Sequence, residues 1–394
     1  MNRRQFLTTT IASSLALAAG AAEEERKLRV VIVGHTGHGD YGHGLDTMWL
    51  RVPETQVVTV IDPESAGLLK AMQRLKVGGG MDSYKVLLAP AKPDLVAIAP
   101  RYVDEHHDMA LAAIEAGAQG IYIEKPFCRT PAEADEIIAT AERRKVKIAI
   151  AHRNRYHPVV PVVQRVVKED AIGRLLEIRC RGKEDPRGGA EDLWVLGAHL
   201  LNLAVVYSGK PVAASATLFQ NGRPVTKADL KEGAEGIGPI AGDEVHARFE
   251  TESGVPVFFD SVANAGVKTA GFGLQLIGTK GIIDFRFDSE PLAQLFAGNP
   301  FQPVKEPRAW VPITSAGIGQ PEPIADLKDQ VGLHLLPAHD LIAAIHEGRP
   351  PLCSAADGLA VVEMIMAIFE SHRLNGQRVT FPLATRQNPL AQWT

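Results

Sequence analysis

The amino-acid sequence predicts two domains: an N-terminal α/β domain with a doubly wound parallel sheet, and a C-terminal α+β domain with a large, mostly antiparallel, open-faced sheet. Three observations support this prediction. Apolar runs alternate with helical stretches in the first part of the chain, runs of alternating polar and apolar residues occur in the second part, and 394 residues exceed the usual size of one compact domain. We expect the first domain at 28–151, the second at 152–383 and a tail at 384–394.

The strands of the first domain are predicted by apolar runs without alternation, which are typical of strands buried on both faces of a parallel sheet. These runs are 28–33, 57–61, 95–99, 121–123 and 146–151. Helical periodicity covers 109–116 and 131–144, and the second helix begins with Thr130 as N-cap and Pro131 in its first turn. Strands that alternate with helices in this way indicate a doubly wound sheet.

A glycine-rich segment directly follows the first predicted strand. Read from the strand end it has the pattern G-x-T-x-x-G, with Thr36 in place of the second glycine; a literal G-x-G-x-x-G begins three residues later. We prefer the first register, because its first glycine turns the chain directly off the strand. Backbone N–H groups at a following helix N-terminus would hold a pyrophosphate. The predicted cofactor-binding residues in this segment are Gly34, Thr36, Gly37, His38 and Gly39.

Asp62 ends the second predicted strand. A carboxylate at this position can accept hydrogen bonds from the ribose hydroxyls of a dinucleotide and would repel a 2′-phosphate, which favours NAD over NADP. The alternative is that Asp62-Pro63 only starts a turn. Its place after a buried strand and a glycine-rich segment favours the cofactor interpretation.

The ends of the next strands carry a more specific pattern. Pro100-Arg101 and His106 precede a helix that closes with Ala116-Gly117, and the following strand ends in Glu124-Lys125-Pro126. This combination resembles the glucose-fructose oxidoreductase/inositol dehydrogenase (Gfo/Idh/MocA) family. The resemblance implies a Rossmann domain in which Lys125 lies beside the nicotinamide and the substrate, with Pro126 in an unusual peptide geometry. It assigns to the cofactor Pro100, Arg101, His106, Glu124 and Lys125.

The resemblance continues through 152–158 and 197–202 and extends to the end of the chain. It implies an oxidoreductase that acts on a sugar or sugar derivative, and it implies a homo-oligomer, a dimer or a tetramer. Oxidation of a sugar hydroxyl needs a base for the O–H proton, and histidine suits that role because its pKa is near neutrality. His199 stands at the family's histidine position, so we expect His199 to be the base and Lys125 its electrostatic partner.

The chain departs from the family where many members carry two aspartates near this histidine: Val195 and Asn202 stand there instead. We hypothesise that Asp192 or Glu191 supplies the missing acid. Trp194 can stack on a sugar face, although a core tryptophan is equally compatible with the sequence. The candidate substrate-binding residues are Arg155, Tyr156, Glu191, Trp194 and Asn202.

The strands of the second domain are predicted at 175–183, 212–220, 243–249, 255–261, 274–277 and 282–285, several of them with polar/apolar alternation. The segments 221–242 and 296–325 are rich in glycine and proline and predict loops.

Residues 1–21 have the features of an export signal. Arg3-Arg4 precede Phe6-Leu7 and a short apolar run, and Ala19-Gly20-Ala21 forms a cleavage site of small residues. The paired arginines resemble the twin-arginine signal, which exports folded proteins. The run is short for a membrane span, so we expect a periplasmic protein without a stable membrane anchor. An exported enzyme of this kind has to hold its NAD tightly and recycle it in place.

Composition excludes some functions and leaves others open. A net charge of −4 and the lack of a basic run argue against nucleic-acid binding. The histidine spacing predicts no metal site, and the three scattered cysteines predict small buried hydrophobic residues, with one disulfide left open. We expect a sugar oxidoreductase; the alternatives are an NAD-dependent glycoside hydrolase that works by transient oxidation and elimination, and a non-catalytic sugar-binding protein.

Overall fold

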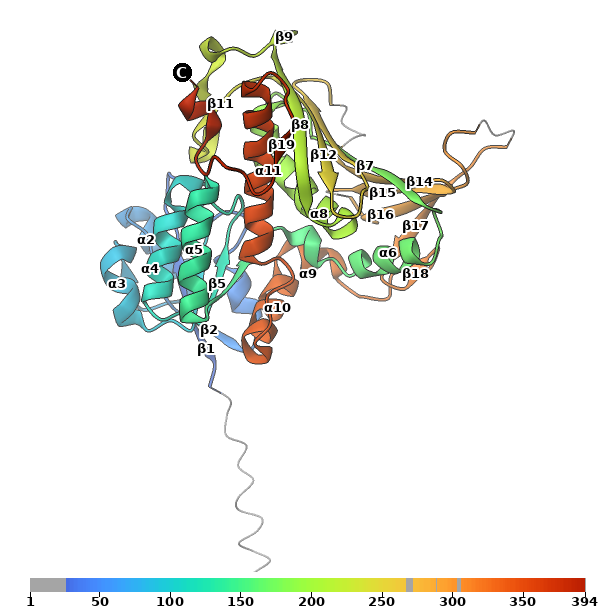
Figure 1. The fold of residues 1–394 in the computed structure, drawn as a ribbon. Helices are drawn as coiled ribbons and strands as arrows, with labels where there is room; N and C mark the ends of the chain where they lie inside the picture. The colour runs from blue at the N-terminus through green and yellow to red at the C-terminus, as the bar shows by residue number, and fades with distance from the viewer. Residues whose placement is uncertain (1–25, 267–271, 288, 303–305, 394) are drawn as a thin grey trace, which may run out of the picture.

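The computed structural model describes residues 26–266, 272–287, 289–302 and 306–393 (Figure 1). The predicted export signal at 1–21 lies outside these residues. Two sheets organise the chain, and the long helix α11, Ala355–Arg373, lies between them (Figure 1).

The first sheet is a six-stranded parallel sheet in the order β3-β2-β1-β4-β5-β6. Its strands are β1 Leu28–Val33, β2 Thr55–Ile61, β3 Gly80–Met81, β4 Leu95–Ile98, β5 Gly120–Ile123 and β6 Lys147–Ile150. Strands β1, β4 and β5 are almost wholly buried, which confirms the prediction drawn from their continuous apolar runs. The order reverses between β1 and β4, and such a switch point is where doubly wound folds bind ligands.

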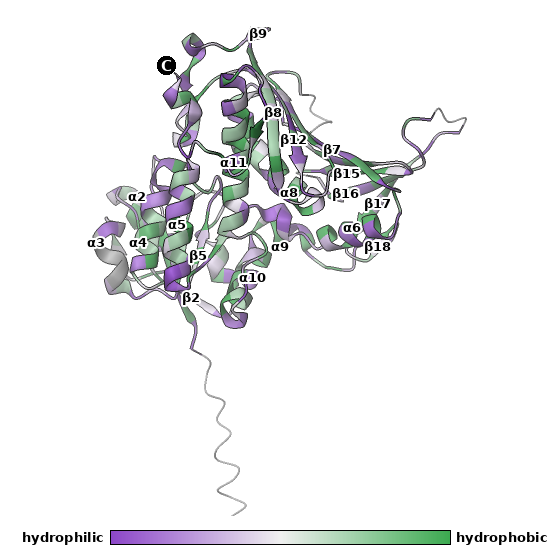
Figure 2. Ribbon diagram, viewed as in Figure 1, coloured by the Kyte–Doolittle hydropathy of each residue, from purple (hydrophilic) through white to green (hydrophobic). Residues whose placement is uncertain are grey.

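Helices α2 Ser65–Leu75, α3 Tyr84–Ala91, α4 His106–Glu115 and α5 Pro131–Arg144 belong to this domain. Helix α5 has the predicted bounds, and Thr130 Oγ1 accepts a hydrogen bond from the Glu133 amide as its N-cap. Figure 2 shows hydrophilic and hydrophobic residues on α2 and α5, as expected for helices that pack by one face.

The helix expected directly after the glycine-rich segment does not form. Between β1 and β2 the described chain makes a series of turns and one 3₁₀ helix, η1 Met48–Arg51. Four glycines here, Gly37, Gly39, Gly42 and Gly44, have φ between +59° and +89°. A right-handed α-helix requires negative φ, so these residues cannot continue β1 into a helix.

The second sheet has eleven strands in the order β18-β17-β16-β15-β14-β7-β13-β12-β8-β19, with β9 paired to β8. It is antiparallel except for the β13–β7 pair. The strands are β7 Leu175–Arg181, β8 Pro211–Gln220, β9 Arg223–Pro224, β12 Glu244–Thr251, β13 Val257–Val262, β14 Gly273–Gly278, β15 Gly281–Arg286, β16 Ala293–Ala297, β17 Trp310–Thr314, β18 Gly317–Ile318 and β19 Val379–Thr380.

All six predicted strands of this domain are confirmed within a few residues. The prediction of a continuous loop at 296–325 is wrong, because β17 and β18 extend the sheet there. Within the predicted loop at 221–242, β10 Lys231–Glu232 and β11 Pro239–Ile240 pair as a separate two-stranded sheet. The sequence did not predict β17 and β18, because Pro312 and the neighbouring glycines are residues typical of loops.

The remaining helices are α6 Val159–Lys168, α7 Ala190–Asp192, the π-helix η4 Leu193–Gly197, α8 Ala198–Ser208, α9 Leu327–Gly332, α10 Leu335–Glu347 and α11. Late in the chain, α10 returns to the first domain, where Leu341 and Ile342 join the apolar cluster that includes Val30, Leu95 and Tyr122 (Figure 1). Helix α11 contacts both α5 and β8 and so joins the two domains.

Among the described residues no helix is long and apolar enough to span a bilayer. Cys128, Cys180 and Cys353 are buried and unbridged, as the prediction of small hydrophobic residues requires.

Candidate active site

The carboxyl ends of five neighbouring strands bring together most of the predicted site. Thr36 follows β1, Asp62 follows β2, Arg101 follows β4, Lys125 follows β5, and a histidine not assigned from the sequence, His152, follows β6. Parallel strands present these ends at one edge of the sheet, where doubly wound folds carry their ligand sites.

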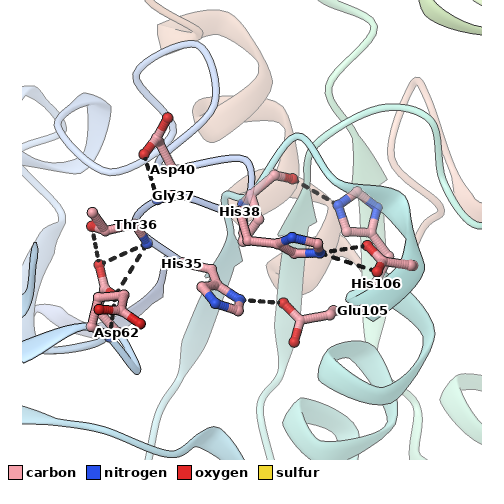
Figure 3. Close-up of polar contacts among 11 residues, drawn as sticks. His35, Thr36, Gly37, His38, Asp40, Asp62, Glu105 and His106 are labelled. Carbon is pink, nitrogen blue, oxygen red and sulfur yellow. Dashed lines mark hydrogen bonds and ion pairs between the residues drawn. The ribbon is translucent and has the colours of Figure 1, made fainter. Parts of the chain in front are cut away.

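The glycine-rich segment folds back on itself rather than onto a helix (Figure 3). His35 and Asp40 exchange backbone hydrogen bonds of 3.1 and 2.9 Å, and the Gly37 amide donates to Asp40 Oδ1 at 3.0 Å. His38 Nε2 lies 3.0 Å from Asp104, beyond β4. Several groups predicted to face a pyrophosphate therefore already have partners within the protein.

Asp62 is fully buried and accepts four hydrogen bonds from its surroundings. They come from the Thr36 hydroxyl at 2.6 Å, the Thr36 amide at 3.2 Å, the Tyr41 hydroxyl at 2.7 Å and the Glu64 amide at 2.9 Å (Figure 3). Asp62 is thus more than a turn residue. Its hydrogen-bonding capacity is, however, largely filled by Thr36 and Tyr41, the groups with which a ribose would compete.

His106 is also fully buried, and both of its ring nitrogens face main-chain carbonyls. Nε2 lies 2.8 Å from the Pro100 oxygen and Nδ1 lies 2.9 Å from the Pro126 oxygen. The ring therefore ties the loop after β4 to the turn after β5. The Lys125–Pro126 peptide bond is cis, which confirms the unusual proline geometry implied by the family resemblance.

Lys125 is buried, and its Nζ donates a hydrogen bond to the Val195 main-chain carbonyl at 3.0 Å. Val195 lies in the π-helix η4, whose wider turn changes the pattern of carbonyl pairing and is frequent at functional sites. A neutral carbonyl thus contacts the lysine from the position at which many family members carry an aspartate. Burial is the main cause that lowers the pKa of Lys125, and the nearby charges of Arg101 and Arg187 add to it, while Glu124 and Glu235 oppose it.

His199 lies in the first turn of α8 and pairs with His152. Their Nδ1 atoms lie 3.0 Å apart, so one ring donates and the other accepts, and the rings meet edge to face. Burial lowers the pKa of His152 to about 3, and burial together with the charges of His152 and Lys125 lowers the pKa of His199 well below 6.5. Both rings are therefore neutral at neutral pH, and a neutral histidine can accept a proton.

Glu124 lies beside Lys125 and contacts the glycine-rich segment. Its Oε1 is 3.1 Å from His43 Nδ1, while the buried Oε2 has no hydrogen-bond partner among the described residues. Burial raises the pKa of Glu124, but the contact with His43 outweighs it and lowers the pKa to about 2. A side chain on Gly42 would lie 2.9 Å from Oε2, so glycine leaves this oxygen open.

The acids proposed to replace the missing aspartates lie differently. Asp192 is fully buried; its Oδ2 accepts hydrogen bonds from the Ser261 hydroxyl at 2.6 Å and the Glu184 amide at 3.1 Å. Burial is the main cause that raises its pKa. Glu191, next to it, is partly exposed. These contacts join Asp192 to the second sheet, and its role as replacement acid stays a prediction.

The remaining candidate substrate residues have mainly structural surroundings. Arg155 donates to the carbonyls of Leu352 and Asn202, and the Asn202 amide donates to Cys353 Sγ at 3.4 Å. Trp194 is fully buried and Tyr156 nearly so. These surroundings favour the core-tryptophan alternative for Trp194.

The sequence-based prediction missed three contributors. His152 could have been found, because it follows the last predicted strand of the sheet. The Val195 carbonyl could not, since any residue supplies a carbonyl and only the π-helix presents this one. Glu235 also lies in no sequence motif that would have predicted its place in the site. Within the described residues no group of three or more His, Cys, Asp or Glu side chains is arranged to hold a metal.

These residues can be tested against NAD, which a Rossmann domain implies. At the nicotinamide end, as the family pattern places it, Glu124 offers a buried oxygen that lacks a donor, beside Lys125. At the adenosine end Asp62 is present but hydrogen-bonded to Tyr41 and Thr36. The site therefore fits a dinucleotide whose ribose hydroxyl replaces either the Tyr41 hydroxyl or the Thr36 hydroxyl as a donor to Asp62.

A doubly wound sheet with this residue cluster at its carboxyl edge, followed by a large antiparallel sheet, defines a two-domain dinucleotide-binding protein. Residues 28–152 match the model of an oxidoreductase family with an NAD-binding Rossmann fold, the Gfo/Idh/MocA family. This match assigns the N-terminal domain to the family's NAD-binding Rossmann fold.

Similar proteins agree with this assignment. Levoglucosan dehydrogenase of Pseudarthrobacter phenanthrenivorans is 25% identical over 359 residues, which cover 81% of this chain and 88% of that protein. D-Apiose dehydrogenase of Paraburkholderia graminis is 27% identical over 125 residues, 32% of this chain and 33% of that protein.

Solved structures share the fold of both domains. A levoglucosan dehydrogenase in complex with NADH and levoglucosan has a TM-score of 0.70 at 22% identity, over 91% of this chain and 100% of that one. An Agrobacterium radiobacter oxidoreductase in complex with NAD⁺, L-tartaric acid and magnesium has a TM-score of 0.65 at 18% identity, over 90% and 98%.

Proposed function

We propose that this chain oxidises a CH–OH group of a sugar and passes the hydride to tightly bound NAD, which a second substrate reoxidises in place. The observation that carries the proposal is the meeting of Lys125, His199 and His152 at the carboxyl edge of the Rossmann sheet. Similarity to levoglucosan dehydrogenase supports a sugar as substrate.

The chain's own residues supply the proton chemistry. His199, kept neutral by burial, takes the hydroxyl proton, and the Nδ1 contact with His152 fixes the orientation of its ring. Lys125, held by the Val195 carbonyl, stabilises the negative charge that develops on the substrate oxygen. A bound nicotinamide supplies the hydride acceptor.

Redox-assisted glycoside cleavage is the second candidate. It is favoured by one observation: neither Lys125 nor His199 is hydrogen-bonded to a side-chain carboxylate among the described residues. The site thus lacks the acid that many sugar dehydrogenases of the family place there.

One experiment separates the two candidates. The mature protein is purified without added NAD, its bound nucleotide is identified, and it is incubated with levoglucosan, D-glucose and p-nitrophenyl glycosides. We expect bound NADH to appear with a free sugar. Nitrophenol release without net NADH would instead establish the cleavage reaction, and a protein that neither contains nor binds NAD would contradict both candidates.

We further propose export by the twin-arginine route and a dimeric or tetrameric state. The paired residues Arg3 and Arg4 support the first proposal. The double substitution R3K/R4K should retain the full-length protein in the cytoplasm, whereas wild-type protein is recovered from the periplasm. Sedimentation of the mature protein tests the second proposal, and a monomer would contradict it.

A further inference from the structure

A short hairpin of the second domain reaches the active-site edge of the first. Strands β10 and β11 pair through Lys231–Ile240 and Glu232–Pro239, and residues 233–238 form the tip. At the tip Gly236 packs on Asp104: a side chain on this glycine would lie 2.5 Å from Asp104 Oδ1, and its φ is +68°. The hairpin therefore lies directly against the loop that follows β4.

The position of the hairpin is fixed by contacts along its length. Ile237 and Ile240 are each only 1% exposed and belong to the main apolar core. The Gly233 amide donates to the Gly238 carbonyl at 2.9 Å, and Asn388 Nδ2 donates to the Pro239 carbonyl at 2.9 Å. The tip is thus held in place rather than projecting freely.

Glu235 lies at the tip with a side chain that is 18% exposed. Its Oε1 is 3.9 Å from Arg101 Nη1, too far for a hydrogen bond, and its Oε2 is buried with no partner among the described residues. Its backbone is left-handed, with φ +56°, a conformation that is costly for a side chain other than glycine or asparagine. A carboxylate oxygen that is buried without a donor is costly and calls for an external donor.

The surroundings place this carboxylate near Arg101 and Lys125. Ile98 of β4 pairs with Ile123 of β5, so Arg101 and Lys125 follow the two strands at nearly the same height. Arg101 contacts Glu235, and the charge of Glu235 acts on Lys125, whose pKa it raises against the effect of burial. Glu235 therefore lies against Arg101 at the carboxyl edge of the sheet, close enough for its charge to act on Lys125.

We propose that Glu235 binds a hydroxyl group of the sugar substrate next to Lys125 and so helps to determine specificity. The inference rests on the proposed sugar oxidoreductase function. A carboxylate accepts two hydroxyl hydrogen bonds well, and sugars carry such donors on adjacent carbons. Glu235 is thus an acidic group near Lys125 that is distinct from Asp192 and Glu191, the two acids that the sequence suggested.

The test compares Glu235→Gln with Glu232→Gln, an exposed glutamate of the same hairpin. Both variants and the wild type are loaded with NAD and titrated with levoglucosan and D-glucose, while nicotinamide absorbance reports reduction. Because each protein reduces its bound NAD once, we expect E235Q to raise the half-saturating sugar concentration, the apparent KM, about 10- to 100-fold with a smaller change in the limiting rate of reduction, since a hydrogen bond to a charged group is lost. E232Q should match the wild type, and NADH affinity should be equal in all three proteins.

Thermal unfolding separates this role from a structural one. A buried carboxylate oxygen without a donor lowers the free energy of unfolding, so E235Q should unfold at the same temperature as the wild type or at a higher one. An unchanged KM in E235Q, with an active wild type, would overturn the inference and leave the proposed function intact. A wild type that reduces NAD with neither sugar would contradict the proposed function on this panel, and the inference with it.

Discussion

Lys125 donates a hydrogen bond to the main-chain carbonyl of Val195, 70 residues later in the chain, over 3.0 Å. The contact crosses from the end of β5 to the π-helix η4. A carbonyl orients the ammonium without neutralising it, so a full positive charge is available to a developing alkoxide. Burial lowers the pKa of the lysine because the charged form is poorly solvated.

The first prediction concerns this charge at alkaline pH. Because the pKa of Lys125 is lowered from 10.5, kcat/KM should fall with rising pH before that value is reached. Lys125→Arg keeps its charge at every accessible pH and should show lower activity, by about 10-fold or more, without the alkaline fall. Lys168→Arg, at an exposed lysine, is the control and should keep the wild-type profile. An alkaline fall that persists in K125R would assign it to another group.

The second prediction concerns the paired histidines. Since the pKa of His199 lies well below 6.5, the acid limb of kcat/KM should also lie below pH 6.5. His152→Asn removes one cause of that lowering, so the acid limb should move upward, with a loss of about 10-fold in kcat from poorer ring orientation. The exposed His346→Gln variant is the control. A wild-type acid limb at or above pH 6.5 would be inconsistent with His199 as the base.

The third prediction concerns stability against pH. Burial lowers the pKa of His334 to about 4, and the Tyr122 hydroxyl lies 2.6 Å from its Nδ1. The unfolded chain binds a proton below about pH 6.5 and the folded chain does not, so stability falls as the pH drops from 6.5 toward 4. The slope from this group is at most about 1.4 kcal/mol per pH unit.

His334→Gln retains an acceptor for Tyr122 but does not titrate. Urea unfolding midpoints at pH 7 and pH 5 should therefore differ less in H334Q than in the wild type, and His346→Gln should behave as the wild type. Equal differences in H334Q and the wild type would show that His334 does not contribute.

The fourth prediction concerns the cofactor. The Tyr41 hydroxyl competes with a ribose for Asp62, so Tyr41→Phe should bind NAD up to about 10-fold more tightly while losing about 1.5–3 kcal/mol of stability from the missing hydrogen bond. Asp62→Asn should weaken binding. Tyr207→Phe loses a hydroxyl contact to the Val160 carbonyl in the second domain and should leave NAD affinity unchanged. Weaker NAD binding in Y41F would mean that Tyr41 supports the cofactor instead.

Sequence patterns predicted the parts of the fold that depend on local chemistry. Continuous apolar runs located β1 and β5, and Thr130-Pro131 fixed the start of α5. The absence of a helix after β1 also has a local cause, namely closely spaced glycines with positive φ. The same glycines form a dinucleotide-binding motif, which led us to expect a helix there. The hydrogen bond from the Tyr41 hydroxyl to Asp62 could not be predicted, since it depends on how a turn folds over the end of a strand.

The site was predicted where a motif fixed the register and missed where contacts cross the chain. Lys125 and His199 were found because each stands in a spaced pattern. The Val195 carbonyl and Glu235 reach the site through tertiary packing, in the second case on a hairpin that the buried Ile237 and Ile240 and the Asn388–Pro239 hydrogen bond hold in place. His152 follows a predicted strand, but its pairing with His199 depends on the packing of α8. No periodic pattern in a sequence predicts which main-chain carbonyls or loop carboxylates enter a site.

Isotope transfer tests the central claim most directly. The NAD-loaded mature protein is mixed with levoglucosan or D-glucose deuterated at the ring carbons, and the bound nucleotide is recovered and weighed by mass spectrometry. The account predicts NADH that carries one deuterium with the wild type and only unlabelled NAD with Lys125→Met. Bound NAD that stays unreduced in the wild type, or label transfer that is undiminished in K125M, would contradict it.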